Sequence, residues 1–317
     1  MAGNPTNNMI QTKDVAVRGL ARCGRVRLLA CVTTHLVNEL QRRHGTWPVA
    51  TAALGRTASV AAMMAMQLKG QERLTVQVKG DGPLGAILVD ADSDGHVRGY
   101  VQHPHVHLPA NALGKLDVGG AVGHGMLYVL RDMGLREVYR GGVELQTGEI
   151  GDDFTYYFAV SEQTPSSVGA GVLVDTDNTV ICSGGFIVQL LPGHTDEDID
   201  WVEAQIRGLS SVTDLLRGGM DATGLAATVL PDVEILEERP LAFRCTCSRD
   251  RLRRILLGLG KEELQAMLAE EGDAEVVCHF CSEVYRFSGD ELEAMIAELA
   301  DKPGDSKLVL DDGREDG

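Results

Sequence analysis

Hydrophobic and polar residues alternate over short runs in the first part of the chain, which is the period expected for strands that bury one face. Glycine-containing turns at 80–83 and 92–95 separate three of these runs, so the runs follow one another as an antiparallel meander. The predicted strands cover residues 14–20, 26–31, 74–79, 85–90, 96–101, 126–130, 139–145 and 168–174. Antiparallel sheets are therefore expected to dominate this part of the fold.

Three stretches have the 3.6-residue period of helices instead. Residues 33–43 are amphipathic, with three apolar side chains on one face. Residues 49–68 are rich in Ala and Met and are apolar all round, which predicts a helix buried at the centre of a domain. A shorter helix is expected over 150–160.

These strands and helices predict an α+β domain over residues 10–191, which ends with an apolar run at 179–191. The domain contains no GxSxG and no HExxH sequence, and no nucleophile with an adjacent base can be recognised in it. The N-terminal domain therefore has no catalytic constellation that the sequence can show.

Residues 192–240 have a different character. Thr195 with Asp198, and Ser211 with Asp214, are helix-start signals, and glycines interrupt what would otherwise be a longer helix. Short helices depend on tertiary contacts for most of their stability. We therefore expect a metastable helical linker that folds only when it is docked, with an ordinary helical linker as the alternative.

Residues 241–301 are interpreted as a small C-terminal module. Ser248 is placed to cap a first helix, and a second helix follows it. A hairpin is expected around 276–287, before a last helix at 290–300. The remaining residues, 302–317, form an acidic tail.

The amino-acid composition and net charge exclude some classes of protein. The chain has 317 residues, 44% of them hydrophobic, and a mean hydropathy of -0.04, so a soluble core can form. No apolar run is long enough to cross a membrane and the start resembles no signal peptide, so a cytoplasmic protein without a membrane partner is expected. The net charge of -17 argues against nucleic acid as a partner, because phosphate binding requires a basic surface.

The charge is unevenly distributed along the chain. Residues 10–79 carry 11 Lys or Arg against 3 Asp or Glu, a balance of +8, whereas residues 192–240 carry 3 against 11, a balance of -8. Two solvated faces of opposite sign would explain this pattern. The alternative hypothesis is that the acidic segment lies across the basic N-terminal part.

Four of the seven cysteines form two close pairs, Cys245 with Cys247 and Cys278 with Cys281. Two short knuckles of this kind can supply the four sulfurs of a tetrahedral zinc site. Such a site can be a purely structural staple, or it can be a switch, because partly exposed thiolates are oxidised and oxidation removes the ligands. The other three cysteines, at positions 23, 31 and 182, are isolated and are expected to be buried apolar residues.

The sequence around these cysteines resembles the redox-regulated 33 kDa heat-shock chaperone family, the 33 kDa chaperonins, and the resemblance covers nearly the whole chain. The motifs that carry it are Arg244-Cys-Thr-Cys-Ser-Arg-Asp-Arg251, Gly260-Lys-Glu-Glu-Leu264, Cys278-His-Phe-Cys-Ser-Glu-Val-Tyr-Arg-Phe287, Val78-Lys-Gly-Asp-Gly-Pro-Leu-Gly85 and Gly148-Glu-Ile-Gly-Asp-Asp-Phe154. A zinc knuckle alone would be weak support for a family, whereas this combination is specific.

The resemblance implies a chaperone and not an enzyme: an ATP-independent holdase that binds unfolding client proteins and prevents their aggregation under oxidative stress. In the reduced, inactive form the four cysteines would bind one Zn²⁺ per chain. In the oxidised form zinc would be lost, Cys245–Cys247 and Cys278–Cys281 disulfides would form, and the active protein would be a homodimer in the cytoplasm.

Two other interpretations use the same cysteines. The C-terminal module could be a structural zinc-ribbon interaction module attached to a metabolic domain, with a constant structure under oxidant. Alternatively, Cys278 and Cys281 could exchange disulfides in a thiol oxidoreductase, although no thioredoxin-like context surrounds them.

Overall fold

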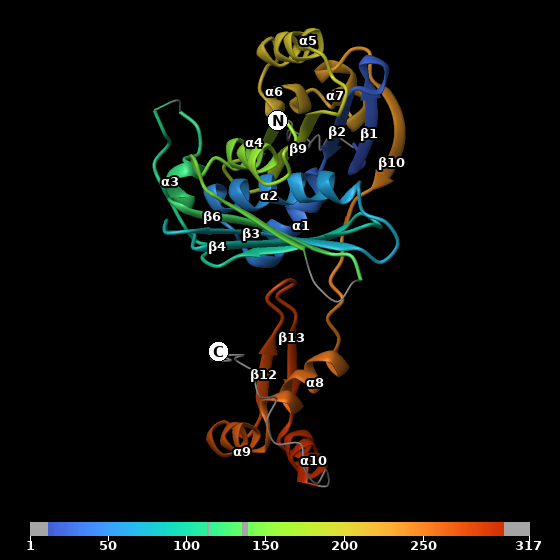
Figure 1. Ribbon diagram of the computed structural model, residues 1–317. Coiled ribbons are helices and arrows are strands. Elements are labelled where there is room, and N and C mark those ends of the chain that lie inside the picture. Colours follow the sequence, from blue (N-terminus) through green and yellow to red (C-terminus); the bar gives the residue numbers. More distant parts are fainter. Residues whose placement is uncertain (1–11, 113, 135–138, 301–317) are drawn as a thin grey trace, which may run out of the picture. The chain divides into compact units, whose positions relative to one another are not determined.

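Helix α2 (Pro48–Ala65) forms the centre of the N-terminal part of the computed structural model, which describes residues 12–112, 114–134 and 139–300 (Figure 1). Every residue of α2 except Pro48 and Arg56 is buried. An apolar sequence on all sides leaves no face for water, so other elements must cover the whole helix. The prediction of a central, buried helix is confirmed. The chain as a whole divides into two compact units, residues 1–245 and 246–317.

Two sheets pack on α2, and their strands are β1 (Val15–Ala21), β2 (Val26–Val32), β3 (Arg73–Gly80), β4 (Ala86–Asp92), β5 (His96–Val101), β6 (Gly125–Asp132), β7 (Tyr139–Glu144), β8 (Ser166–Val174), β9 (Val180–Leu190), β10 (Glu234–Pro240) and β11 (Ala242–Phe243). One sheet has the order β10-β1-β2-β9-β8 and the other has the order β11-β5-β4-β3-β6-β7. All the predicted strands are present, and the α+β architecture is confirmed.

Smaller helices complete this unit. Helix α1 (Thr34–His44) buries Leu36, Val37 and Leu40, as its amphipathic pattern predicts. Helix α4 (Ile150–Val160) buries an aromatic group against the same core, and α3 (Val118–Val122) is a single short turn capped by Asp117. The 3-10 turn η1 (Arg22–Gly24) connects β1 to β2.

Residues 192–240 fold onto the five-stranded sheet. They form α5 (Asp196–Arg207), α6 (Val212–Arg217) and α7 (Ala222–Val229), which lie over this sheet in Figure 1, and then β10. Both predicted helix-start signals are confirmed, because the side chains of Thr195 and Ser211 accept the backbone amides of Asp198 and Asp214.

Strand β10 was not anticipated, because the segment was expected to be helical. Its residues are alternately exposed and half-buried, and its sequence is mostly charged, so no hydrophobic alternation reveals it. It is a strand because it pairs with β1, with Val15 opposite Pro240. Directly after it, β11 pairs in parallel with β5. One short stretch of chain therefore closes one edge of each sheet in turn.

An ion-pair group, the α5 clasp, ties α5 to the β1–β2 turn. Asp198 accepts from the Nε atoms of Arg25 at 2.6 Å and Arg22 at 2.9 Å, and its side chain is 0% exposed. The Arg22 guanidinium also lies over the Trp201 ring, 5.3 Å from its centroid. The hydrogen bond from Arg25, above all, holds the pKa of Asp198 well below its usual range. The hypothesis that the acidic segment lies on the basic N-terminal part is confirmed.

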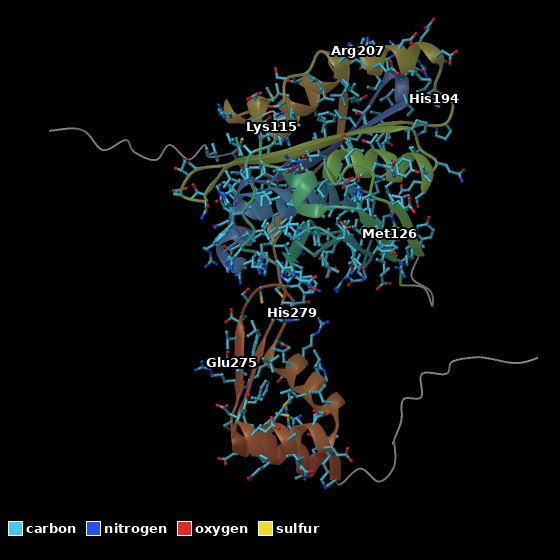
Figure 2. The ribbon with its side chains drawn as sticks, turned by 90° about the vertical axis from the view of Figure 1, so that its left-hand side faces the viewer. Lys115, Met126, His194, Arg207, Glu275 and His279 are labelled. Atoms are coloured by element: carbon cyan, nitrogen blue, oxygen red, sulfur yellow. The ribbon has the colours of Figure 1, made fainter. Side chains whose placement is uncertain are left out.

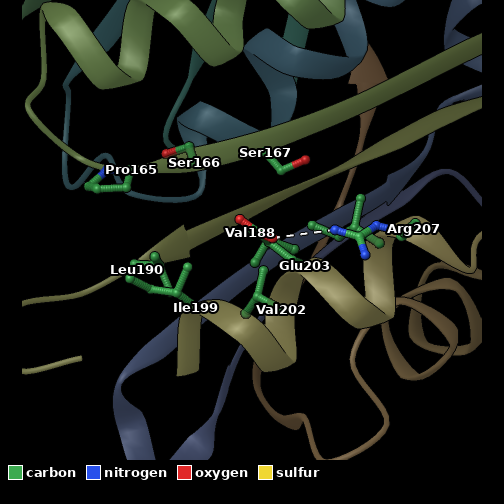
Figure 3. Close-up of a pocket in the computed structure, with 10 residues that line it drawn as sticks. Pro165, Ser166, Ser167, Val188, Leu190, Ile199, Val202, Glu203 and Arg207 are labelled. Carbon is green, nitrogen blue, oxygen red and sulfur yellow. Dashed lines mark ion pairs between the residues drawn. The ribbon is translucent and has the colours of Figure 1, made fainter. Parts of the chain in front are cut away.

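The rest of α5 is only partly buried against the five-stranded sheet. Only Asp198 and Val202 are buried among its residues. A hollow of about 410 Å³ separates α5 from β8 and β9, and Glu203 and Arg207 form an ion pair beside it (Figure 3). The hollow is mostly apolar, with walls that include Val188, Leu190, Ile199, Val202 and Ile206. The α5 clasp therefore carries much of the attachment of this helix.

Within residues 246–300, the C-terminal unit forms three helices and a hairpin: α8 (Arg249–Leu259), α9 (Lys261–Glu270), β12 (Ala274–Val277), β13 (Val284–Phe287) and α10 (Gly289–Ala300). Ser248 caps α8, as predicted, by accepting the amide of Arg251. The buried core of this unit is small: Leu252, Leu256, Leu264, Ala274, Phe287, Leu292 and Met295. The predicted acidic tail, 302–317, lies outside the described residues.

None of the helices in the described ranges combines the length and the apolar character that a bilayer-crossing helix requires.

We expect Asp198→Asn to loosen α5, because the neutral amide leaves two arginine side chains without their shared carboxylate. Hydrogen exchange at the α5 amides should become at least about tenfold faster, while the α2 amides remain protected. Since the folded-state pKa of Asp198 is lowered, its stabilising effect is present at neutral pH and is lost only in strong acid. Asp200→Asn, an exposed change of the same charge on the same helix, is the matched control. Equal exchange in both variants would contradict the role of the clasp.

Candidate metal centre

The four paired cysteines come together although some thirty residues separate the pairs. Cys245 and Cys247 lie on the extended segment between β11 and α8, and Cys278 and Cys281 lie in the turn between β12 and β13. Their four Sγ atoms all lie within 4.8 Å of one another. The structure thus brings together the four sulfurs that the sequence singles out.

The turn of the hairpin is shaped to present its two sulfurs. The amide of Cys281 donates to the carbonyl of Cys278 at 3.3 Å, and the amide of Ser282 donates to the same carbonyl at 2.8 Å. Ser282 has a φ of 57°, in the left-handed region, and the amide of Cys278 donates to Glu283 at 2.9 Å. These bonds fold the chain back within four residues. His279, labelled in Figure 2, is exposed at this turn and is not among the clustered ligands.

Two side chains that the sequence analysis did not assign a role contact the sulfurs. The Tyr285 hydroxyl lies 3.3 Å from Cys247 Sγ, and this hydrogen bond raises the pKa of Tyr285, so the phenol stays protonated and can donate. In the N-terminal unit, Arg98 Nη1 donates to Cys245 Sγ at 3.7 Å while Asp90 holds the same guanidinium. Both groups can donate a hydrogen bond to a thiolate sulfur. Tyr285 falls within the cysteine motif, whereas nothing in the sequence around Arg98 reveals its contact.

The cluster fits a thiophilic metal ion. Four thiolates at about 2.3 Å from a tetrahedral Zn²⁺ stand about 3.8 Å apart, and here Cys247 Sγ and Cys281 Sγ are 3.3 Å apart. Among the residues that the structure describes, no carboxylate belongs to the cluster, so hard cations such as Mg²⁺ or Ca²⁺ are poorly matched. The donor set is consistent with zinc.

Access to the sulfurs is uneven. Cys281 is buried, with 5% of its surface exposed, while Cys245, Cys247 and Cys278 are partly exposed. A small oxidant can therefore reach both cysteine pairs. The chemistry that the arrangement permits is metal binding by thiolates and oxidation of the same thiolates.

The three isolated cysteines divide into two kinds. Cys31 and Cys182 are buried, as expected, and burial raises the pKa of both thiols, that of Cys182 to about 11, so they stay protonated. Cys23 is exposed, and the prediction that it is buried is wrong. It lies in the turn η1 with a φ of 53°, where the chain reverses between two strands and the side chain points away from the core.

A second group of possible ligands, Asp92, Asp94 and His96, lies at the β4–β5 turn. One Asp92 oxygen accepts the amides of Asp94 and His96, and the other lies 3.2 Å from His96 Nδ1. The turn itself accounts for this arrangement.

Comparison with known proteins shows the family to which this chain belongs. The model of the family described as "Hsp33 protein" matches residues 14–288. The chain belongs to the Hsp33 family.

Relatives and a solved structure agree with this assignment. The chain is 51% identical over 284 residues to the 33 kDa chaperonin of Bacillus subtilis, covering 89% of this chain and 98% of that protein. It is 50% identical over 288 residues to the 33 kDa chaperonin of Halalkalibacterium halodurans, covering 90% and 99%. The crystal structure of the 33 kDa chaperonin (heat shock protein 33 homolog) from Thermotoga maritima matches with a TM-score of 0.86 and 36% identity, over 92% of this chain and 100% of that chain. Membership of the Hsp33 family supports a heat-shock chaperone.

We expect the reduced protein to contain one zinc ion per chain, and Cys281→Ser to lose most of it, because three sulfurs bind Zn²⁺ far more weakly than four. Metal content after removal of free zinc, measured by mass spectrometry, checks this. Cys182→Ser changes the same atom in a cysteine outside the cluster and should retain the metal. Full zinc content in Cys281→Ser, or loss of zinc from Cys182→Ser, would contradict the ligand assignment.

Proposed function

We propose that this chain is a redox-regulated, ATP-independent holdase that binds unfolding proteins and prevents their aggregation under oxidative stress. In the reduced form, Cys245, Cys247, Cys278 and Cys281 hold one zinc ion. The observation that carries the proposal is the cysteine-only, partly exposed cluster in a member of the Hsp33 family. A bound Zn²⁺ supplies folding free energy to the unit that holds it.

The size of the C-terminal unit supports a switch. Seven buried residues form the core of its described part, 246–300, which is few for a segment of this length. A structural zinc ion contributes on the order of 10–16 kcal/mol in small modules, more than such a core can supply by itself. Loss of the ligand set is therefore sufficient to unfold residues 241–301, the proposed redox-switch domain.

Oxidation supplies the trigger. Two thiols that join as a disulfide release two electrons and two protons, and a peroxide that accepts them leaves as two molecules of water. The proposed pairs are Cys245–Cys247 and Cys278–Cys281. Sulfur atoms in disulfides no longer act as thiolate ligands, so oxidation and metal binding exclude each other.

Residues 192–240 are the proposed metastable linker between the core domain, 10–191, and the switch. The hollow beneath α5 and the dependence of this helix on the α5 clasp support this role. Release of the segment would uncover the apolar residues of β9 and of α5 itself, and exposed apolar surface binds non-native chains. The proposed partners are unfolding client proteins, the proposed active form is a homodimer, and the proposed location is the cytoplasm.

We expect the protein to suppress the aggregation of a heat-unfolded client after treatment with peroxide and not before it. Light scattering of the client, followed together with zinc release, measures this. A thiol oxidoreductase would instead turn over dithiol substrates, and a passive zinc module would do neither. Equal suppression by the reduced, zinc-loaded and the oxidised protein would refute redox regulation.

We expect the Cys278–Cys281 disulfide to form before the Cys245–Cys247 disulfide. The first pair lies across a hydrogen-bonded turn in which the chain already folds back, so its sulfurs can join without a change in the direction of the backbone. The second pair is on an extended segment, where α-carbons two residues apart are about 6.5–7 Å from each other, at the limit of disulfide geometry. Peptide mapping by mass spectrometry at successive times of oxidation gives the order, and the reverse order would refute the argument.

A further inference from the structure

The segment that leads to Cys245 lies along the outer edge of β5, and we call Leu241–Cys245 the strap. Three of its amides donate to backbone carbonyls of the N-terminal unit: Leu241 to Asp14 at 2.9 Å, Ala242 to Gly95 at 3.1 Å and Arg244 to Val97 at 3.2 Å. The strap is thus an added edge strand on the six-stranded sheet, parallel to β5.

The side chains of the strap alternate between the core and water. Leu241 is buried in the main core, with 7% of its surface exposed, and Phe243 packs against the same core. The Arg43 guanidinium lies over the Phe243 ring, 4.3 Å from its centroid. Ala242 and Arg244 are exposed. Main-chain bonds together with pockets for alternate side chains are the way in which a sheet edge takes up an extended peptide.

The strap forms fewer backbone pairs than an ordinary strand of this sheet. Its ladder pairs two residues, Ala242 with His96 and Phe243 with Val97, whereas β5 has six residues. Its N-terminal end continues directly into β10, but its C-terminal end is Cys245, a proposed zinc ligand. Formation of a Cys245–Cys247 disulfide requires the extended chain to bend there, which draws Cys245 away from Arg98. We therefore expect the strap to detach from β5 beginning at Cys245, its C-terminal residue.

The two edges of the other sheet are protected in ways that β5 is not. At the β8 edge, the amide of Val168 donates to the hydroxyl of Thr155 on α4. Strand β10 carries a Glu-Glu-Arg-Pro sequence at its end, and charges and proline discourage further pairing. At β5, by contrast, the chain's own extended apolar segment covers the edge.

We infer that the outer edge of β5 is a docking site for an extended apolar segment of an unfolding client, and that the strap occupies this site until it is released. The inference rests on the proposed function and adds the surface and the mode of binding. The client segment would add as a strand, with one large apolar side chain in the place of Phe243 and another in the place of Leu241. Main-chain hydrogen bonds require no particular sequence, so this mode suits a chaperone with many clients.

Hydrogen exchange on the full-length protein tests the inference directly. Oxidation should speed exchange at the amides of Ala242 and Arg244, which the strap bonds protect in the reduced form. Addition of a permanently unfolded probe, reduced and carboxymethylated lactalbumin, should then slow exchange within His96–Val101. Unchanged exchange in His96–Val101 while the probe is bound would overturn the inference.

A pair of variants tests the same point in the reduced, zinc-loaded protein. Ala242→Pro removes the amide that donates to Gly95, and Ala242→Ser keeps it, at a position whose side chain is exposed. The proline variant should retain one zinc ion per chain and bind the lactalbumin probe about fivefold more than the serine variant, as expected for the loss of one backbone hydrogen bond. Equal binding in the two variants, with fast exchange at Arg244 showing that the strap is open in the proline variant, would overturn the inference.

The outcomes separate this inference from the proposed function. Oxidised protein that binds no probe refutes the proposed function, and the inference with it. Oxidised protein that binds the probe without protecting His96–Val101 refutes only the β5 site, and the holdase stands.

Discussion

The burial of one helix determines most of this structure. Helix α2 has apolar or small residues on every side, so it is stable only where something covers each face. One sheet cannot do this, and two sheets pack on it instead. Once two sheets share one helix, the unit has sheet edges to close, and β10 and β11 close one on each sheet in succession. The segment that closes these two edges continues directly to Cys245.

The parts of the molecule are attached by different forces. The core around α2 is held by the burial of apolar side chains, which is insensitive to oxidants. By contrast, α5 relies on the clasp of Asp198 with two arginines, above a hollow of about 410 Å³. The strap relies on three backbone hydrogen bonds and two side chains, and the C-terminal unit on a small core beside four sulfurs. The parts that the proposed holdase would need to open are therefore held by less buried apolar surface than the core around α2.

These differences in how the parts of the molecule are held provide a physical basis for the proposed switch. If the four sulfurs carry much of the stability of the C-terminal unit, their oxidation changes that unit first. Cys245 is the last residue of the strap and also a member of the cysteine cluster. A change at the cluster therefore acts directly on the strap, which covers the edge of β5. Helices α5 to α7 lie between β9 and β10 in the chain, and they cover the apolar face of the other sheet. The same event can thus reach both sheets while α2 stays buried.

Much of this protein is determined by its sequence alone. The alternation of apolar residues marks the strands from β1 to β8, the apolar run 49–68 marks α2, and the helix-start signals mark α5, α6 and α8, because these features depend on near neighbours in the chain. The spacing of the cysteines identifies the cluster for the same reason. The tertiary structure decided what depends on residues far apart: the pairing that makes a charged stretch into β10, the partners of Asp198 more than 170 positions away, and the contact of Arg98 with Cys245. Cys23 is exposed because a turn points it outward, which no composition can show.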